Sequence, residues 1–432
     1  TGATAREMLV SAAAKRWGVD SASCRTENSS VYHDASNRSM TYGNLISDAS
    51  GQKVPKKPQL KDPSKFRYIG KSIPQIDTPD KVSGRTVYGM DVRLPGMLYA
   101  TVVHPPVFGA SVKSIDDREA KKIAGVKKVF QVSLGVAVVA KSTWAAFKGA
   151  RSLHIEWDNG DFSMDSKDIS KSFRDLARNK GVVARNDGNA EKAMKTVERR
   201  LEAIYEVPYL AHATMEPMNC TAWVHDGICE VWTGTQNPLG FAAEVADALD
   251  MDIENVHLYN AYLGGGFGRR AFPDYTIQAA TVAAEVAYPV QLIWSREEDM
   301  RHDHYRQASI SRFRAALDET GTPTAWINQY VEKHDPIEAP WIPYDIENQY
   351  IHYAESDTHV PWGFWRSVDH SLHAFFTESF IDELAFAEAQ RLRPCEPRVE
   401  HPSIRCECHH EVPDAGSLHE RQNRDVQDDR RE

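Results

Sequence analysis

The sequence predicts an α+β protein, and three observations lead to that fold class. Short runs rich in β-branched residues recur from about residue 87 onward, with turn residues between them. Segments with small apolar residues at helical spacing lie between several of these runs. Hydrophobic residues make up 41% of the 432 residues, so the chain is able to bury substantial cores.

Composition also excludes several function classes. The chain carries 61 acidic and 51 basic residues, a net charge of −10, and lacks the basic footprint of a protein that binds nucleic acid or an anionic membrane surface. No apolar stretch approaches 18 residues, so no membrane span is expected. Six cysteines are too few for a disulfide scaffold.

The first 75 residues are expected to form a helix, short strands and a linker. Residues 3–17 carry Ala, Met, Leu and Val at helical spacing, and short polar strands follow up to about residue 50. Residues 51–75 are rich in proline and lysine, which is typical of a linker. Because the chain opens on Thr1 almost inside a helix, and shows no signal-peptide pattern, we expect the natural N-terminus to lie upstream.

Residues 76–160 are predicted to form a compact α+β unit. The expected strands are Val87–Val92, Leu98–Val103, Val126–Val132, Gly135–Ala140 and His154–Trp157, with a helix over Ser142–Leu153. Residues 161–194 form a charged connector with a helix predicted over Ser163–Arg178.

Residues 195–390 are predicted to form a second α+β region. Strands are expected at Arg200–Val207, Thr221–Trp232, Val256–Tyr262 and Val290–Trp294, and helices at Leu239–Leu249, Asp274–Val286 and Phe375–Glu388. Long antiparallel strands are expected over residues 305–332.

Composition changes abruptly in residues 391–432. This segment holds 18 charged residues, eight of them arginine, with no lysine and no aromatic residue. The pattern predicts a disordered tail or a shifted reading frame. Cys406, Cys408, His409 and His410 lie together there and suggest zinc, but a chance cluster is the alternative, because structural zinc sites favour C-x2–4-C spacing.

The sharpest local motif is the run Gly264-Gly265-Gly266-Phe267-Gly268-Arg269-Arg270, between an expected strand and an expected helix. Free backbone N–H groups at such a place can cradle an anion, and two arginines add donors for phosphate or carboxylate. The spacing matches neither the dinucleotide-binding nor the nucleoside triphosphate motif. The alternative is a tight turn between packed elements.

Three further side chains are candidates for chemistry. Gln236 follows a strand end and is able to orient an oxo or hydroxyl group, although an ordinary turn is the alternative. Glu216, in Met215-Glu-Pro217, is either a buried acid or base, or a structural ion-pair partner. Arg366, among aromatic residues, either binds an anionic or carbonyl-bearing substrate or makes a cation–π contact.

The order of the motifs is more specific than any one of them. It runs Lys81–Gly84, Gly89–Ala100, Gly135–Ala140, Met215–Pro217, Thr235–Pro238, Gly264–Gly268 and Phe364–Arg366. Over residues 1–388 this series resembles the molybdopterin-binding large subunit of the xanthine dehydrogenase/aldehyde oxidase family, in the branch of the isoquinoline 1-oxidoreductase beta subunits.

The resemblance implies a fold and a domain order. Residues 76–160 are similar to the α/β hammerhead domain of the family. Residues 195–390 are similar to the first part of the molybdenum-cofactor-binding domain, and residues 1–50 to a displaced piece of that domain.

The resemblance also implies a reaction. A molybdenum–molybdopterin cofactor, in the cytosine dinucleotide form, hydroxylates an N-heterocycle or an aldehyde with oxygen from water. Electrons leave to a [2Fe-2S] partner subunit, and no side chain is required as a metal ligand. Substrate identity and compartment stay open.

By position, the resemblance assigns Gln236 to a molybdenum oxygen and Arg366 to the substrate as the catalytic pair. Gly264, Gly265, Gly266, Phe267, Gly268 and Arg269 join Gln236 in the cofactor-binding set.

Three departures from the family pattern favour an alternative. The Gly-Gln-Gly-type segment that this branch carries is expected upstream of Thr1. Asp369 stands where glycine is usual, and we expect its carboxylate to crowd or neutralise Arg366. The family's catalytic glutamate is expected beyond residue 432. The alternative is a truncated, non-catalytic remnant that binds at most a partner subunit or a small anion at Gly264–Arg270.

Overall fold

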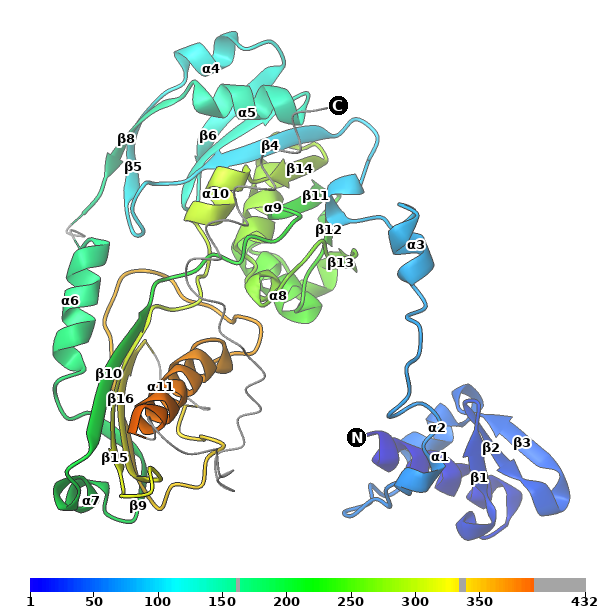
Figure 1. Cartoon of the computed structure of the whole chain (residues 1–432). Helices are drawn as coiled ribbons and strands as arrows, with labels where there is room; N and C mark the ends of the chain where they lie inside the picture. Colours follow the sequence, from blue (N-terminus) through cyan, green and yellow to red (C-terminus); the bar gives the residue numbers. More distant parts are fainter. Residues whose placement is uncertain (161–163, 334–338, 392–432) are drawn as a thin grey trace, which may run out of the picture. The chain divides into compact units, whose positions relative to one another are not determined.

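The computed structural model describes residues 1–160, 164–333 and 339–391, with side chains up to residue 388 (Figure 1). The predictions for the tail after residue 391, including its cysteine–histidine cluster, lie outside the described residues. The chain divides into two compact units, 1–86 and 87–432. No helix in the described ranges is long and apolar enough to cross a membrane.

The first unit contains the predicted N-terminal helix and a small sheet. Its elements are α1 (Gly2–Trp17), β1 (Arg25–Glu27), β2 (Ser30–His33), β3 (Arg38–Thr41), α2 (Ile46–Ser50) and α3 (Thr78–Val82). The strands form an antiparallel sheet in the order β1-β2-β3. Ala12 and Ala13 of α1 pack on Val31 and Leu45 to make its core.

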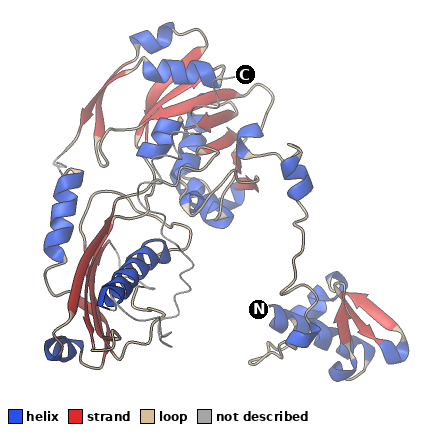
Figure 2. Ribbon diagram, viewed as in Figure 1, coloured by secondary structure: helices blue, strands red, loops and turns tan. Residues whose placement is uncertain are grey.

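The second unit is built around two sheets, each covered by helices (Figure 2). The larger has seven strands in the order β13-β12-β11-β14-β4-β7-β6. These are β4 (Leu98–Val103), β6 (Val126–Val132), β7 (Gly135–Ala140), β11 (Asn219–His225), β12 (Ile228–Thr233), β13 (Val256–Asn260) and β14 (Val290–Ile293). Helices α8 (Pro238–Leu249) and α9 (Asp274–Val286) pack on it through Phe241 and Tyr275.

This sheet joins the two regions that the sequence separates at residue 160. Strand β4 pairs with β7 on one side and runs parallel to β14 on the other, with Leu98 opposite Val290. The other elements of residues 87–160 are α4 (Arg118–Lys122), α5 (Thr143–Arg151) and the pair β5 (Ser111–Asp116) and β8 (His154–Asp158). The predicted strands of this region are therefore partly components of a larger sheet.

Two strand predictions are wrong. Val87–Val92 contains a 3-10 turn at Gly89–Asp91, because the N–H of Met90 donates to the carboxylate of Glu216 and not to a neighbouring strand. Thr221–Trp232 is a hairpin of two strands, because Asp226 and Gly227 have positive φ angles of 47° and 80° and reverse the chain.

The second sheet has five strands in the order β10-β15-β16-β17-β9. These are β9 (Val182–Asp187), β10 (Arg200–Val207), β15 (Ser309–Leu317), β16 (Pro323–Glu332) and β17 (Asn348–Glu355). Phe313 and Leu317 pack with α11 (His370–Arg391), whereas Ile310 packs with α6 (Ser166–Leu176), and Ala316 with α7 (Ala190–Thr196). Because strand side chains alternate, α11 covers one face and the other two helices cover the opposite face. The predicted helices over 163–178 and 375–388 are confirmed, with shifted ends.

Candidate functional site

The glycine-rich run lies between β13 and α9 and is pressed against two other segments. Gly268 has a φ of +112°, and a Cβ there would lie 1.7 Å from the carbonyl oxygen of Phe364. A Cβ on Gly264 would lie 2.3 Å from the Cβ of Glu216. Glycine is therefore required at both positions, by close approach of the backbone and, at Gly268, also by its dihedral angle.

Glu216 fixes the beginning of this loop. Its Oε1 accepts the N–H of Met90 at 3.0 Å, and its Oε2 accepts the N–H of Gly264 at 2.8 Å. The same Oε2 lies 3.1 Å from the guanidinium of Arg270. Since both oxygens are occupied and the residue is buried, the structure supports the structural ion-pair reading of Glu216.

The two arginines point into the protein. Arg269 donates twice to Asp274, at 2.9 and 2.8 Å, and its Nε lies 3.0 Å from Oδ1 of Asp303. Arg270 donates to the carbonyl oxygens of Gly265 at 2.9 Å and Glu216 at 3.0 Å. Both side chains are buried and bonded to the protein itself, which favours a structural role over donation to a bound anion. Their hydrogen bonds hold the loop instead.

Arg269 and its neighbouring carboxylates shift pKa values within this network. Burial alone would lower the pKa of Arg269, but the carboxylates of Asp274 and Asp303 outweigh it and raise that pKa. Burial would raise the pKa of Asp274, yet Arg269 holds it below its usual range. Arg269 and Asp274 are therefore a buried ion pair, whose geometry depends on each partner keeping its hydrogen bonds.

The side-chain amide of Gln236 is held in one orientation, and its NH2 group has no acceptor among the described residues. Its Oε1 accepts the N–H of Gly268 at 3.0 Å, and its backbone N–H donates to the carbonyl of Arg270 at 2.9 Å. Gln236 is an exposed residue, and its Nε2 has no partner among the described residues. Gly265, Gly266 and Phe267 also have backbone N–H groups with no acceptor in the described part of the chain. Nε2 of Gln236 and the N–H groups of Gly265, Gly266 and Phe267 are the unsatisfied donors of the site, here named the donor row.

Arg366 lies on the segment that crosses Gly268. Its side chain is exposed and makes no ion pair with any described residue. Ser367 and Val368 follow with positive φ angles of 71° and 49°, so the chain turns sharply after the arginine. Asp369 is buried and does not pair with Arg366, and the expectation that it would neutralise the arginine is therefore wrong.

Sequence reasoning missed His212 and Asp303. Nδ1 of His212 lies 3.0 Å from both carboxylate oxygens of Asp303, and its Nε2 lies 2.7 Å from the carbonyl oxygen of Phe364. His212 begins the His-Ala-Thr-Met-Glu-Pro run, in which the pattern points only to Glu216. Asp303, between two histidines, belongs to no recognisable motif.

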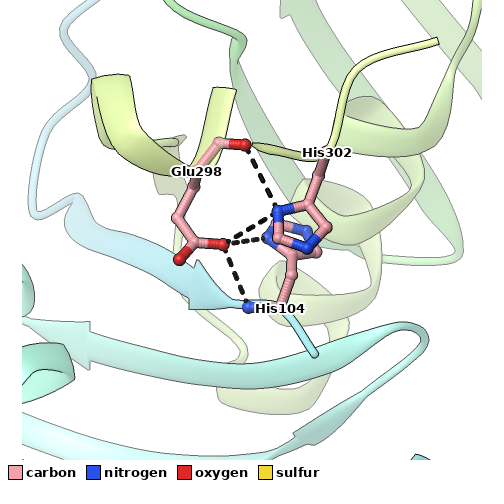
Figure 3. Close-up of side chains that lie close together, drawn as sticks. All are labelled: His104, Glu298 and His302. Carbon is pink, nitrogen blue, oxygen red and sulfur yellow. Dashed lines mark hydrogen bonds and ion pairs between the residues drawn. The ribbon is translucent and has the colours of Figure 1, made fainter. Parts of the chain in front are cut away.

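A second cluster contains His104, Glu298 and His302 (Figure 3). Burial lowers the pKa of His104. Burial would raise the pKa of Glu298, but hydrogen bonds from the two histidines lower it to about 2. A charged carboxylate therefore accepts the Nδ1–H of His104 at 2.7 Å.

The residues behind this cluster favour hydrogen bonding over metal binding. Zinc ligands about 2.0–2.1 Å from the metal stand roughly 3.3 Å apart in a tetrahedral site, which exceeds that 2.7 Å contact. Trp294 donates to Oε1 of Gln278, and this orients the Gln278 amide so that Nε2 donates to Nε2 of His104. His104 therefore carries its proton on Nδ1, where a metal would have to bind.

With the fold and the loop geometry established, comparison with known proteins identifies the class. Residues 174–396, about half of the chain, match the model of the molybdopterin cofactor-binding domain. The chain belongs to this family. The resemblance to the molybdenum-binding subunits of the xanthine dehydrogenase family is confirmed.

Two curated relatives illustrate the relationship. The beta subunit of isoquinoline 1-oxidoreductase from Brevundimonas diminuta is 31% identical, over 89% of this chain and 57% of its own length. One subunit of the nicotinate dehydrogenase from Pseudomonas putida is 27% identical, over 93% of this chain and 36% of its own length. The chain thus spans from about a third to somewhat over half of these relatives.

Solved structures show the same fold. Quinoline 2-oxidoreductase from Pseudomonas putida 86 aligns with a TM-score of 0.60 at 18% identity, covering 74% of this chain and 48% of the other. The aldehyde oxidoreductase from Desulfovibrio gigas aligns with a TM-score of 0.61 at 18% identity, covering 73% and 42%. The predicted α+β fold of a molybdenum hydroxylase large subunit is therefore confirmed.

Proposed function

We propose that this chain forms part of a molybdenum hydroxylase that oxidises an N-heterocycle or an aldehyde, taking oxygen from water and passing electrons to a [2Fe-2S] subunit. The observation that carries the proposal is the amide of Gln236. Gly268 fixes its oxygen, and its Nε2 is left exposed beside a row of loop N–H groups without acceptors among the described residues.

The donors present fit a molybdopterin cofactor. Its metal carries anionic oxygen and sulfur groups, which accept hydrogen bonds, and the groups left without acceptors at the loop are donors. When bound, the cofactor supplies the two-electron oxidation and transfers oxygen that comes from water. Gln236 would hold it through Nε2, and Gly265, Gly266 and Phe267 through backbone N–H groups.

Arg366 would act on the substrate. An exposed guanidinium without an ion-pair partner among the described residues is able to bind a carbonyl or ring nitrogen and to stabilise negative charge that develops there. Phe267 and Phe364, 44% and 55% exposed, flank Gly268 and offer aromatic surface to a flat ring. This combination favours an aromatic N-heterocycle over an aliphatic aldehyde.

The cofactor form and the partner subunit are further parts of this proposal. Two of them are named as subunits, which supports an enzyme of more than one chain. We infer the cytosine dinucleotide form of the cofactor and a small [2Fe-2S] protein as electron acceptor. The same donor row would bind a small anion if the chain is instead a non-catalytic remnant, and the following experiment separates the two functions.

The test is dye-linked oxidation of isoquinoline, and of benzaldehyde for comparison, by the chain produced with a candidate [2Fe-2S] protein in cells that make the cofactor. Gln236→Ala is expected to reduce kcat by about 100-fold or more, as loss of one positioned donor does. Gln131→Ala, at an exposed glutamine of the same unit, is the matched control and should leave the rate unchanged. Anion binding without any oxidation in the wild type would favour the remnant.

A further inference from the structure

Two site segments meet at one carbonyl oxygen. A Cβ on Gly268 would lie 1.7 Å from the oxygen of Phe364, so the glycine loop passes directly against it. From the other side, Nε2 of His212 lies 2.7 Å from the same oxygen. Because a carbonyl oxygen only accepts, His212 must donate its Nε2–H there.

Asp303 links His212 back to the glycine loop. Its Oδ2 accepts the backbone N–H of His212, and both of its oxygens lie 3.0 Å from Nδ1 of the same residue. Its Oδ1 also lies 3.0 Å from Nε of Arg269, the residue that follows Gly268. The contacts therefore close a ring that runs through Gly268, Arg269, Asp303, His212 and Phe364.

Burial makes this ring sensitive to each member. The side chains of His212, Asp303 and Arg269 are 1%, 2% and 1% exposed, so water cannot replace a lost partner. Trp365 adds a contact on the outside, with its ring centroid 4.7 Å from that of His212. The N–H of Gly363 donates to the carbonyl of Tyr305 at 2.9 Å, which ties the arginine segment to the backbone two residues after Asp303.

We propose that His212 and Asp303 are positioning residues that hold the Phe364–Arg366 segment in register with Gln236 and the glycine loop. This inference rests on the proposed function for its meaning, because the register would set where Arg366 meets a substrate relative to the donor row. Both side chains are buried and bond to other parts of the protein. Asp303 orients His212, and His212 donates a hydrogen bond to the carbonyl oxygen of Phe364, two residues before Arg366.

Substitutions at Asp303 and His212 test whether these hydrogen bonds hold the segment in place. In Asp303→Asn an NH2 group replaces one of the two carboxylate oxygens. Whichever oxygen it replaces, this NH2 group then faces another N–H donor. It meets the backbone N–H of His212 in one orientation and Nε of Arg269 in the other. His212→Leu removes the hydrogen bond to the carbonyl oxygen of Phe364, whereas His212→Gln is able to keep an N–H donor near the position of Nε2.

The experiment is hydrogen exchange of the full chain, read peptide by peptide by mass spectrometry without cofactor. Asp303→Asn and His212→Leu are expected to speed exchange about tenfold in residues 361–370 and 264–272, the effect of losing one well-formed hydrogen bond to a charged group. Exchange outside these segments and the peptides that contain residues 212 and 303 should match the wild type, and His212→Gln should restore most of the protection. Asp226→Asn, whose side chain is 93% exposed, is the matched control.

The outcomes separate this inference from the proposed function. Faster exchange confined to the two segments supports positioning, whether or not the chain takes up molybdenum. Faster exchange throughout residues 87–391, or no change in either segment, would overturn it. Equal protection in His212→Leu and His212→Gln would also overturn it, because the Nε2 donor would then be irrelevant.

Discussion

Glu216 offers the sharpest energetic test of how the loop is built. Its carboxylate accepts from Met90 and Gly264 and pairs with Arg270, whose side chain is fully buried. In Glu216→Gln the amide group must face either the N–H of Met90 or the N–H of Gly264. In each orientation the NH2 group of the glutamine faces a backbone N–H, and two donors then repel each other. The guanidinium of Arg270 also loses its charged partner.

The expected cost is large. Breaking a buried ion pair by removing one partner costs about 3–5 kcal/mol, because the remaining charge stays buried. Some of that cost is offset here, since Arg270 keeps its bonds to the carbonyl oxygens of Gly265 and Glu216. We therefore expect a loss of about 3 kcal/mol, which is a substantial part of a typical domain stability of roughly 5–15 kcal/mol.

Urea unfolding followed by tryptophan fluorescence measures this loss. Nine of the ten tryptophans lie after residue 86, so the signal reports mainly on the second unit. With a urea m-value of about 2–3 kcal/mol/M, the midpoint should fall by roughly 1 M or more. Glu244→Gln, at an exposed glutamate on α8, should not move it. If Glu216→Gln lowers the unfolding free energy by less than about 1 kcal/mol, Glu216 does not hold the loop in place as argued.

Three further predictions address the loop, the second sheet and the substrate arginine. Gly268→Ala should cost about 2–4 kcal/mol in the same unfolding assay, because the methyl group meets the oxygen of Phe364 at a strained φ; an unchanged midpoint would contradict the close approach. Burial lowers the pKa of His352 to about 4, below the roughly 6.5 of an unfolded chain. The unfolded state therefore takes up the proton first, and unfolding free energy should fall by about 3 kcal/mol between pH 6.5 and pH 4. His352→Asn, which keeps an acceptor for the N–H of Gly181, should flatten that slope, and an equally steep slope would count against it. Arg366→Lys should reduce kcat/KM by about tenfold or more, since a lysine cannot reproduce a bidentate contact; equal values in both enzymes would exclude the arginine from substrate binding.

Local pattern was enough to find the loop and much of the secondary structure. The sequence alone shows a run of glycines between an expected strand and an expected helix. It also shows an arginine among aromatic residues about a hundred positions later. The parallel pairing of β4 with β14 was not, because nothing local joins Leu98 to Val290. For the same reason, the sequence did not reveal that strands from residues 98–140 and from residues 219–293 lie in one seven-stranded sheet.

The roles of the polar residues depended on partners far along the chain. A guanidinium after a glycine run serves a ligand or an internal carboxylate equally well, and for Arg269 the outcome was decided by Asp274 and Asp303. His212 and Asp303 are 91 positions apart and belong to no spacing motif. Gln236 was predictable as a candidate, but only the contact with Gly268 shows which half of its amide remains free.

Molybdenum and pterin content of the purified full chain, produced in cells that make the cofactor, tests the central claim most directly. A molybdenum enzyme of the host, purified from the same cells, reports whether cofactor was available. The donor row of Gln236 and the glycine loop predicts about one molybdenum and one pterin per chain. Less than about 0.1 of either, beside a fully loaded host enzyme, would contradict the account.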